Sequence, residues 1–221
     1  SAVAIVDGAY QTSLEAAFTK AFEYENPVID IIKDIDLSAT KWCVDMKSAT
    51  KVKTLVINGN NHTINGLSVS VAATNDPNGE IGAGASNYYG VGFISRVDYS
   101  QTLTINDLTF NNANIDDKGM NISLSHHTSG VAVVVGISYG KSTLNNVNVL
   151  NSSVYGGEKI GALIGYSDNI SDEIINCSVE NTSISTFQAF AAYAIGFCSK
   201  VPSITNLKLV NNNVSFDSNS P

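Results

Sequence analysis

Ile174-Ile-Asn-Cys-Ser-Val-Glu-Asn181 returns thirty residues later as Ile204-Thr-Asn-Leu-Lys-Leu-Val-Asn211. Each copy has an apolar residue, an Asp, Asn or Gly two positions later, and then two apolar residues alternating with a polar one. Self-similarity at a spacing of about 30 residues is typical of a solenoid, in which each unit buries its apolar side only by stacking on its neighbours. The pattern occurs six times, beginning at Ile32, Ile64, Ile105, Leu144, Ile174 and Ile204.

The Asp, Asn or Gly in each unit is a predicted corner. Side chains on the same face of a flat strand are two residues apart. The first two apolar residues of each unit are three residues apart, so the chain must turn between them for both to be buried. Asp, Asn and Gly are the residues that best tolerate a left-handed backbone. We therefore expect positive φ at Asp34, Gly66, Asp107, Asn146, Asn176 and Asn206.

A second row of asparagines lies seven residues after the start of each of the last four units, at Asn112, Asn151, Asn181 and Asn211. Strands in a sheet are about 4.8 Å apart, a spacing that lets stacked amides pass hydrogen bonds from one unit to the next. The row is therefore predicted to be structural.

The first 27 residues differ in period from the rest. Thr12 and Glu15 have capping-box spacing, and an apolar stripe with helical spacing follows it at Leu14, Ala17, Phe18, Ala21 and Phe22. We expect a helix over 12–24 that covers the first unit, because an uncovered end would expose core and strand edges. Trp42 is expected to close the core edge beneath this helix.

Strand chemistry replaces the helical period after Pro27, and strands are predicted at 28–32, 35–37, 54–57, 67–71, 91–94, 103–105 and 108–110, with equivalents downstream. The sequence thus predicts one all-β domain over 1–221: a right-handed parallel β-helix of about six coils over 28–221, behind an N-terminal cap over 1–27. The rival is a leucine-rich repeat, which Ile105, Leu108, Phe110 and Ile115 partly match, but no helical pattern follows them.

Two units carry insertions, at 72–90 and 116–130. Both leave their unit just after the same predicted strand, so they should project side by side, and insertions in solenoids often form the binding face. The candidate contact residues are Tyr88, Tyr89, Asp116, Asp117, His126, His127 and Tyr155. Aromatic rings in loops can stack on sugars, although they more often cover the core. Adjacent aspartates are usually solvated, and two adjacent histidines without a third ligand make a weak metal site.

Composition excludes some partners. The formal net charge is -8, and Arg96 is the only arginine, so a groove that tracks nucleic-acid phosphates or an anionic membrane surface has little basic material. No apolar run is long enough to span a membrane. The odd count of cysteines (Cys43, Cys177 and Cys198) leaves at least one unpaired within the chain; Cys177 occupies an apolar slot, and a Cys177–Cys198 bridge stays open.

Catalytic apparatus is not evident, and we predict no cofactor, metal or catalytic residue. A calcium-assisted lyase needs clustered carboxylates and an Arg or Lys base, and no Asp or Glu group recurs near Arg96 at the spacing of the units. Glycoside hydrolysis needs two carboxylates flanking one bond. Asp116 and Asp117 could supply them, so a polysaccharide lyase or hydrolase remains the alternative to a non-catalytic module.

Several stretches resemble bacterial surface β-helix proteins with GLUG-type repeats. They are Asp34-Ile-Asp-Leu37 followed by Trp42, then Leu55-Val-Ile-Asn-Gly-Asn-Asn-His-Thr-Ile-Asn-Gly-Leu67, and Gly161-Ala-Leu-Ile-Gly165. The resemblance implies an adhesin-like protein that is extracellular or on the cell surface, with any signal peptide removed. It carries no catalytic residues. We expect a non-catalytic module that binds glycans or host macromolecules; a structural stalk of a larger surface protein is a further alternative.

Overall fold

The computed structural model describes residues 1–70, 90–117 and 130–217. The described chain is all-β, with three sheets, one α-helix (α1, Leu14–Ala21) and a short 3-10 helix (η1, Met46–Ser48). Sheet A contains β1 (Ala4–Val6), β2 (Ala9–Gln11), β3 (Val28–Ile31), β4 (Ile35–Asp36), β5 (Thr54–Asn65), β9 (Thr102–Asn111), β13 (Lys141–Leu150), β16 (Glu173–Ile175), β17 (Ser178–Glu180), β20 (Ser203–Thr205) and β21 (Lys208–Val210).

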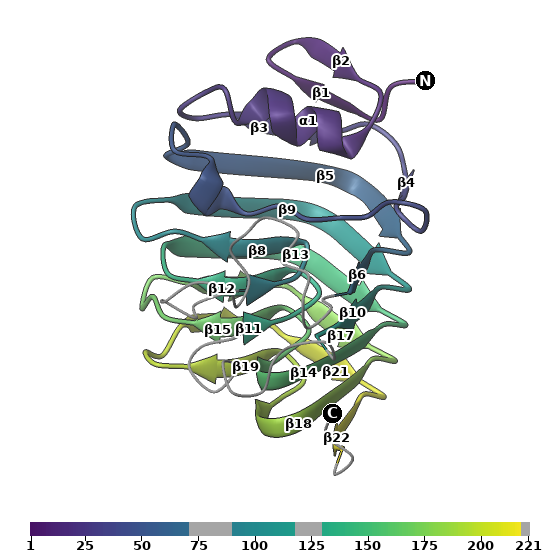
Figure 1. The fold of residues 1–221 in the computed structure, drawn as a ribbon, viewed down its shortest axis with the longest axis vertical. Helices are drawn as coiled ribbons and strands as arrows, with labels where there is room; N and C mark the ends of the chain where they lie inside the picture. The colour runs from purple at the N-terminus through teal and green to yellow at the C-terminus, as the bar shows by residue number, and fades with distance from the viewer. Residues whose placement is uncertain (71–89, 118–129, 218–221) are drawn as a thin grey trace.

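Sheet B contains β6 (Ser68–Ser70), β7 (Gly90–Val91), β10 (Asn114–Asp116), β11 (Gly130–Val131), β14 (Ser153–Ile160), β18 (Ser183–Ala191) and β22 (Asn213–Phe216). Sheet C contains β8 (Ile94–Val97), β12 (Val135–Ser138), β15 (Ile164–Ser167) and β19 (Ile195–Cys198). The chain visits sheets A, B and C in turn, and from β3 onward the strands pair in parallel with those of the next unit (Figure 1). This parallel-sheet architecture is compatible with the predicted β-helix.

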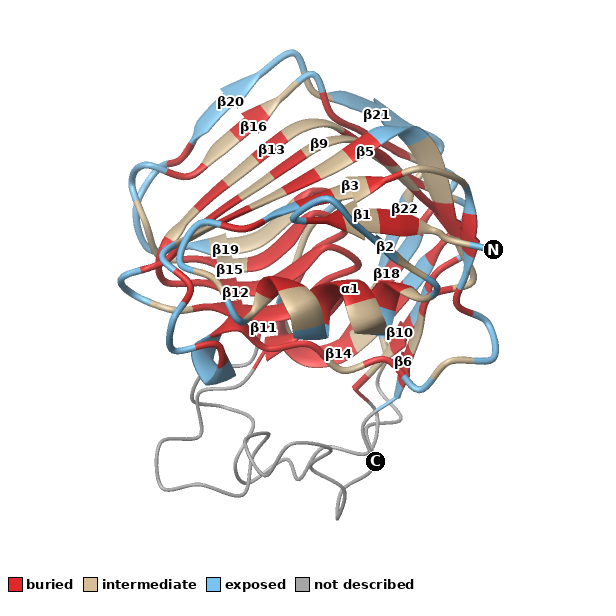
Figure 2. Cartoon of the chain, turned by 90° about the horizontal axis from the view of Figure 1, so that it is seen from above, coloured by how far each residue is buried: buried red, intermediate tan, exposed pale blue. Residues whose placement is uncertain are grey.

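The core is the space that the three sheets face. Buried residues alternate with half-buried ones along β9 and β13, as the pleat of a strand with one buried face requires (Figure 2). The same apolar position then stacks from unit to unit: Ile57 pairs with Ile105, and Leu144 with Ile105 and Ile174. All four side chains are fully buried, so each unit buries its apolar face against its neighbours.

The pairing confirms the register of the last four units and corrects the first two. Ile105, Leu144, Ile174 and Ile204 are opposite one another as predicted, but Ile57, not Ile64, pairs with Ile105, and Ile29, not Ile32, pairs with Ile57. The cause is a bulge in β5: the pairing shifts between Asn58 and His62, where Asn60 and Asn61 both have positive φ. Ile64 consequently pairs with Phe110.

Left-handed backbone occurs at five of the six predicted corners. The values are +70° at Gly66, +53° at Asp107 and Asn146, +52° at Asn176 and +55° at Asn206. The expectation is wrong for Asp34, which is not among the residues with positive φ; its carboxylate instead accepts the backbone N–H of Thr63 at 2.9 Å. Asn112, Asn151, Asn181 and Asn211 form a second left-handed row, each at +51° to +54°.

Asparagine side chains connect the units on the outside of the sheets. Asn151 donates to Asn111 at 2.9 Å, Asn181 to Asn151 at 3.3 Å and Asn211 to Asn181 at 2.7 Å. The first link is Asn111, which donates to Asn65 at 3.0 Å, rather than the predicted Asn112. The amide ladder therefore runs from the second unit to the last.

Asn181→Leu should lower the free energy of unfolding by about 1–2 kcal/mol, since it removes one ladder amide and puts a branched side chain at φ +51°. Chemical denaturation followed by circular dichroism measures this. Asn145→Leu on the outer face of β13 is the matched control, because Asn145 has no positive φ, and should change stability by less than about 0.5 kcal/mol. Equal stability of the two variants would remove the structural role of the ladder.

The N-terminal end is covered by α1 and a hairpin. Ser13, not Thr12, is the N-cap, since its side chain accepts the Ala16 N–H at 3.1 Å; the helix is shorter at both ends than the predicted 12–24. Leu14, Ala17, Phe18 and Ala21 are buried as the stripe predicts. Strands β1 and β2, which were not predicted, pair antiparallel beside β3 and end the parallel stack.

Trp42 closes the core beneath the helix, as expected. It is 2% exposed, its ring centroid is 5.6 Å from that of Phe18, and it stacks on Phe93 at 5.1 Å. The three cysteines are free thiols, so the Cys177–Cys198 bridge is not formed. Cys177 is buried in the apolar slot that the repeat assigns to it.

Candidate binding face

Both insertions begin and end at paired positions of neighbouring units. Ser70, the last described residue before the first insertion, is opposite Asp116, and the returning residues Gly90 and Gly130 are opposite each other. The insertion interiors, with the predicted contact residues Tyr88, Tyr89, His126 and His127, lie outside the described residues. The anchors of the two insertions nevertheless lie side by side, and all four anchoring strands, β6, β7, β10 and β11, belong to sheet B.

The return points have a steric reason to be glycine. A Cβ on Gly90 would lie 1.6 Å from the Ser95 carbonyl oxygen, and one on Gly130 would lie 2.1 Å from the Gly136 carbonyl oxygen. The returning strands β7 and β11 are thus pressed onto the backbone of sheet C, and any side chain there would force them apart. Close backbone packing fixes where each insertion rejoins its unit.

The next unit crosses the same gap without an insertion. In β14, Tyr155 is opposite Asp116 and Ile160 is opposite Val131, so four residues, Gly156-Gly157-Glu158-Lys159, replace the whole second insertion. The pairing of β14 with β18 shifts between Gly156 and Glu158, which marks a bulge. Bulges commonly re-aim a side chain beside a functional site.

Lys159 and Phe190 are the re-aimed side chains. They are opposite each other in β14 and β18, and both have φ +56°, a left-handed value that is uncommon for a long or bulky side chain. The Lys159 ammonium lies 5.2 Å from the Tyr166 ring and 5.7 Å from the Phe197 ring, within cation–π range, and 3.3 Å from the Glu158 carboxylate. The bulge therefore folds a buried cation over the outer face of sheet C.

An aromatic row runs along that face. Successive ring centroids are 4.6 Å apart for Tyr99–Tyr139, 6.0 Å for Tyr139–Tyr166, 5.6 Å for Tyr166–Phe197 and 5.0 Å for Phe197–Phe190. Tyr99 is 69% exposed and Phe190 50%, so both ends of the row meet solvent. Most of this row was not predicted from the sequence. The signal was an aromatic residue directly after the glycine in Ile164-Gly-Tyr-Ser167 and Ile195-Gly-Phe-Cys198.

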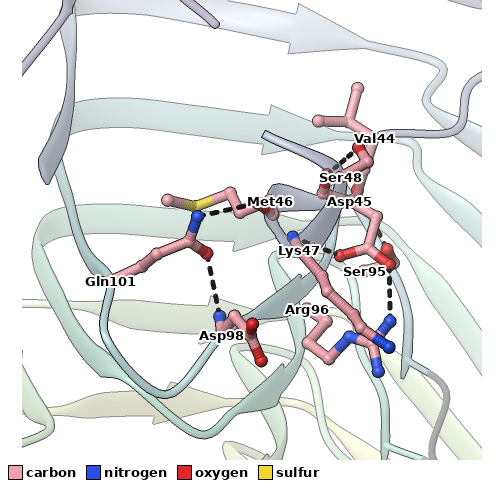
Figure 3. A network of polar contacts seen from close by, with 9 residues as sticks. All are labelled: Val44, Asp45, Met46, Lys47, Ser48, Ser95, Arg96, Asp98 and Gln101. Atoms are coloured by element: carbon pink, nitrogen blue, oxygen red, sulfur yellow. Dashed lines mark hydrogen bonds and ion pairs between the residues drawn. The ribbon is translucent and has the colours of Figure 1, made fainter. Parts of the chain in front are cut away.

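The single arginine ties the segment around η1 to sheet C (Figure 3). The Arg96 Nη2 lies 3.0 Å from the Asp45 Oδ2, and both side chains are about 5% exposed. The Lys47 N–H donates to the other Asp45 oxygen at 2.8 Å, and the Gln101 amide donates to the Met46 carbonyl at 2.8 Å. Arg96 is therefore part of a buried structural ion pair.

The remaining predicted contact residues differ in exposure. Asp116 and Tyr155 are half-buried and opposite each other, whereas Asp117 is fully buried and lies beneath the face rather than on it. The Tyr155 hydroxyl donates to Asp217 at 3.1 Å. Burial disfavours the phenolate and, with this hydrogen bond, raises the pKa of Tyr155 to about 12. Tyr155 therefore stays neutral at physiological pH.

A separate shallow groove lies on the outer face of sheet A. Its volume is about 410 Å³, and its lining is mainly polar, with Asn148, Asn176, Ser178, Asn206 and Lys208 among the residues. Lys208 pairs with Glu180 at 2.9 Å. This groove offers hydrogen-bonding groups but no aromatic ring, in contrast to the aromatic row along sheet C.

In residues 1–70, 90–117 and 130–217, no three His, Cys, Asp or Glu side chains gather as a metal site would require. Across the same described ranges, no helix has the length and apolar character needed to cross a membrane. Comparison with protein-family models, curated proteins and solved structures gave no match.

Proposed function

We propose that this chain is a right-handed parallel β-helix of about six coils that acts as a non-catalytic extracellular or cell-surface binding module, adhesin-like in kind, and that its ligand is a glycan. The observation that carries the proposal is the pairing of Ser70 with Asp116 and of Gly90 with Gly130. Two insertions based side by side on one face of a rigid stack make a composite surface, and functional loops are commonly presented in this way.

The fold part of the proposal has two supports. The chain passes through sheets A, B and C in a fixed order with parallel pairing between units, and such connections are right-handed in nearly all proteins. A leucine-rich repeat would usually place a helical segment after each strand, whereas the one α-helix of the described residues precedes the repeats.

The ligand class follows from the chemistry of the face. Sugars are bound by aromatic rings that stack on their apolar sides, together with polar groups that meet their hydroxyls. The rings of Tyr99 and Phe190 are exposed at the two ends of the aromatic row, and Asp116 and Tyr155, in sheet B, add polar groups. Nearby charged groups are already engaged, Glu158 with Lys159 and Asp45 with Arg96, which favours binding over acid–base catalysis.

The test is a glycan array probed with the protein and with a loop-replaced variant. The uninterrupted β14 supplies the design: Gly-Gly-Glu, the first three of the four residues that join Tyr155 to Ile160, is grafted between Ser70 and Gly90 and between Asp116 and Gly130, so that both return glycines remain. We expect binding by the parent and at least a tenfold loss in the variant, about 1.4 kcal/mol or more.

Three outcomes decide the matter. Binding that disappears with the insertions supports the proposal. Binding that survives their replacement would move the site to another surface, such as the groove on sheet A, and contradict the proposed face. Silence across the array would refute a glycan ligand.

A further inference from the structure

A pocket lies in the N-terminal cap, where β1 pairs with β3 (Figure 1). Its volume is about 340 Å³, within the range of small-molecule sites. The lining comes from residues 5–8, from the loop that follows α1 and from β3. None of these residues belongs to sheet B, which carries the bases of both insertions. A site here is therefore separate from the proposed glycan face.

The floor of the pocket is the outer face of the sheet. Ile5 is opposite Asp30 in the antiparallel pair, and directly opposite residues point to the same face. Val28 lies two residues before Asp30, so it shares that face, and it is 39% exposed. The intervening residues of β3, Ile29 and Ile31, are fully buried in the core. The floor therefore combines two aliphatic side chains with a carboxylate.

The loop that forms one wall is held by the first coil. The Thr54 N–H donates to the Glu25 carbonyl at 3.1 Å, and its hydroxyl donates to the Asn26 side chain at 2.9 Å. The Val56 N–H donates to the Pro27 carbonyl at 3.1 Å. A wall that is already fixed by such bonds costs little further ordering when a ligand binds.

Asp7 and Asp30 give the pocket its charge, and both are held in place. Asp7 lies in a tight turn in which it and Gly8 have φ values of +50° and +73°. The Asp30 Oδ1 accepts the Asn58 amide at 2.9 Å. Of the described residues that line the pocket, none is Lys, Arg or His. The lining therefore carries two carboxylates and no cation.

Lysines on the neighbouring segments are paired with other carboxylates. Lys20, whose ammonium lies 5.6 Å from the Tyr24 ring centroid, is 3.3 Å from Glu23, and Lys53 is 2.8 Å from Glu25. An ionised carboxylate only accepts hydrogen bonds, and its bonds to a cationic donor are stronger than those to a neutral one. The pocket thus favours a positively charged N–H donor that is attached to an apolar stem.

We infer that this pocket binds a protonated primary amine on an aliphatic stem, of the kind a lysine side chain presents. The ammonium meets the carboxylates of Asp7 and Asp30, and the methylene groups pack on Ile5 and Val28. Lysine stems commonly cover apolar surface in this way while the charged end meets polar groups. The chain thereby has a second binding activity, directed at an amine rather than a glycan.

The test is an NMR titration of the isotopically labelled 221-residue chain with Nα-acetyl-lysine methylamide. We expect saturable shifts of the Gly8 and Val28 backbone amides, with a dissociation constant on the order of 1 mM for a ligand of this size. The norleucine analogue has the same aliphatic stem without the ammonium and should bind at least about tenfold more weakly. Added salt should also weaken binding of the lysine probe, because the attraction is electrostatic.

Asp7→Asn and Asp30→Asn remove the two charges and spare the fold. Asn tolerates the left-handed backbone of position 7, and at position 30 it retains an acceptor for the Asn58 amide. The double variant should bind the lysine probe at least about tenfold more weakly than the parent. The matched control is Asp36→Asn, which removes an exposed carboxylate outside the pocket and should bind like the parent.

n-Pentylamine, which has the ammonium and stem without peptide groups, distinguishes the source of the amine. Tighter binding of the lysine probe would indicate a lysine of a polypeptide and tighter binding of n-pentylamine a free amine; both support the inference. The inference is overturned if neither amine gives saturable shifts up to tens of millimolar, if the norleucine analogue binds equally well, or if binding persists in the double variant. The insertion-replaced variant should bind the lysine probe like the parent, so failure here leaves the glycan proposal standing.

Discussion

Phe93→Ala should lower the free energy of unfolding by about 3–5 kcal/mol, the usual cost of removing a fully buried aromatic side chain. Phe93 joins three parts of the molecule. Its ring centroid is 5.1 Å from that of Trp42, 5.7 Å from that of Phe18 on α1 and 5.0 Å from that of Phe110 on β9. The resulting cavity would lie where the helix covers the core, so it cannot collapse without moving α1. Urea denaturation followed by circular dichroism measures the loss.

Trp42 provides a second readout, because it is the only tryptophan. Its indole N–H donates to the Phe93 backbone carbonyl at 2.7 Å, a bond that the substitution leaves available. We expect the emission of Trp42 to shift to longer wavelength as water enters beside the indole. Phe216→Ala is the matched control: the ring is 63% exposed, and its loss should cost less than about 1 kcal/mol. Similar losses in the two variants would mean that the aromatic cluster does not secure this end.

The repeat could be predicted from the sequence because its signal is local and periodic. In the last four units, apolar spacing, corner residue and asparagine row agree, and the pairing of Ile105, Leu144, Ile174 and Ile204 confirms the register. In the second unit, Asn60 and Asn61 add a bulge between two apolar positions. A pattern search that allows no insertion then prefers Ile64 as the start, although its partner is Phe110.

Two local features were predicted incorrectly or missed although signals were present. The predicted strand 91–94 is broken, since β7 ends at Val91 and β8 begins at Ile94. Gly92 lies in the break, and glycine is a common marker of such bends. The N-terminal hairpin turns at Asp7 and Gly8, both with positive φ; Asp-Gly between apolar residues is a strong two-residue hairpin signal.

The features of the candidate face also differ in whether they could be predicted from the sequence. Both insertions leave their units at equivalent positions of the repeat, so their neighbouring bases could be predicted from the sequence. The left-handed conformation of Lys159 and Phe190 depends on a bulge between β14 and β18, and the Arg96–Asp45 pair joins residues 51 positions apart. Neither feature produces a periodic pattern in the sequence, because each arises from tertiary packing rather than from the local conformational preference of the residues.

Asp172 should make folding more favourable at mildly acid pH. Its side chain is fully buried between sheets A and C, where Oδ1 accepts the Ser142 N–H at 2.7 Å and the Ser138 hydroxyl at 3.0 Å, and Oδ2 accepts the Ser167 hydroxyl at 2.7 Å. Burial raises the pKa of Asp172 from 3.8 to about 6, against the opposing effect of these hydrogen bonds. The folded state therefore binds the proton more tightly than the unfolded state does.

The contribution of a raised carboxyl pKa is fully present below about pH 3.8 and is lost as the pH rises through about 6. Lowering the pH from about 7.5 to about 4.5 should thus stabilise the parent by about 2 kcal/mol relative to Asp172→Asn, which cannot titrate but retains an acceptor for the Ser142 N–H. Urea denaturation of both proteins at several pH values measures this difference.

Asp36→Asn is the control for the Asp172 prediction, because the pKa of Asp36 is shifted in the opposite direction. The Asp36 carboxylate is exposed, and hydrogen bonds from the Ser38 side chain and backbone N–H hold its pKa below the usual value. Its contribution is therefore present above the unfolded pKa and lost only at more acid pH, so Asp36→Asn should leave the profile between about pH 4.5 and 7.5 unchanged. If Asp172→Asn likewise follows the parent over this range, Asp172 is not the buried group that titrates there, and the carboxyl must reach water in the folded state.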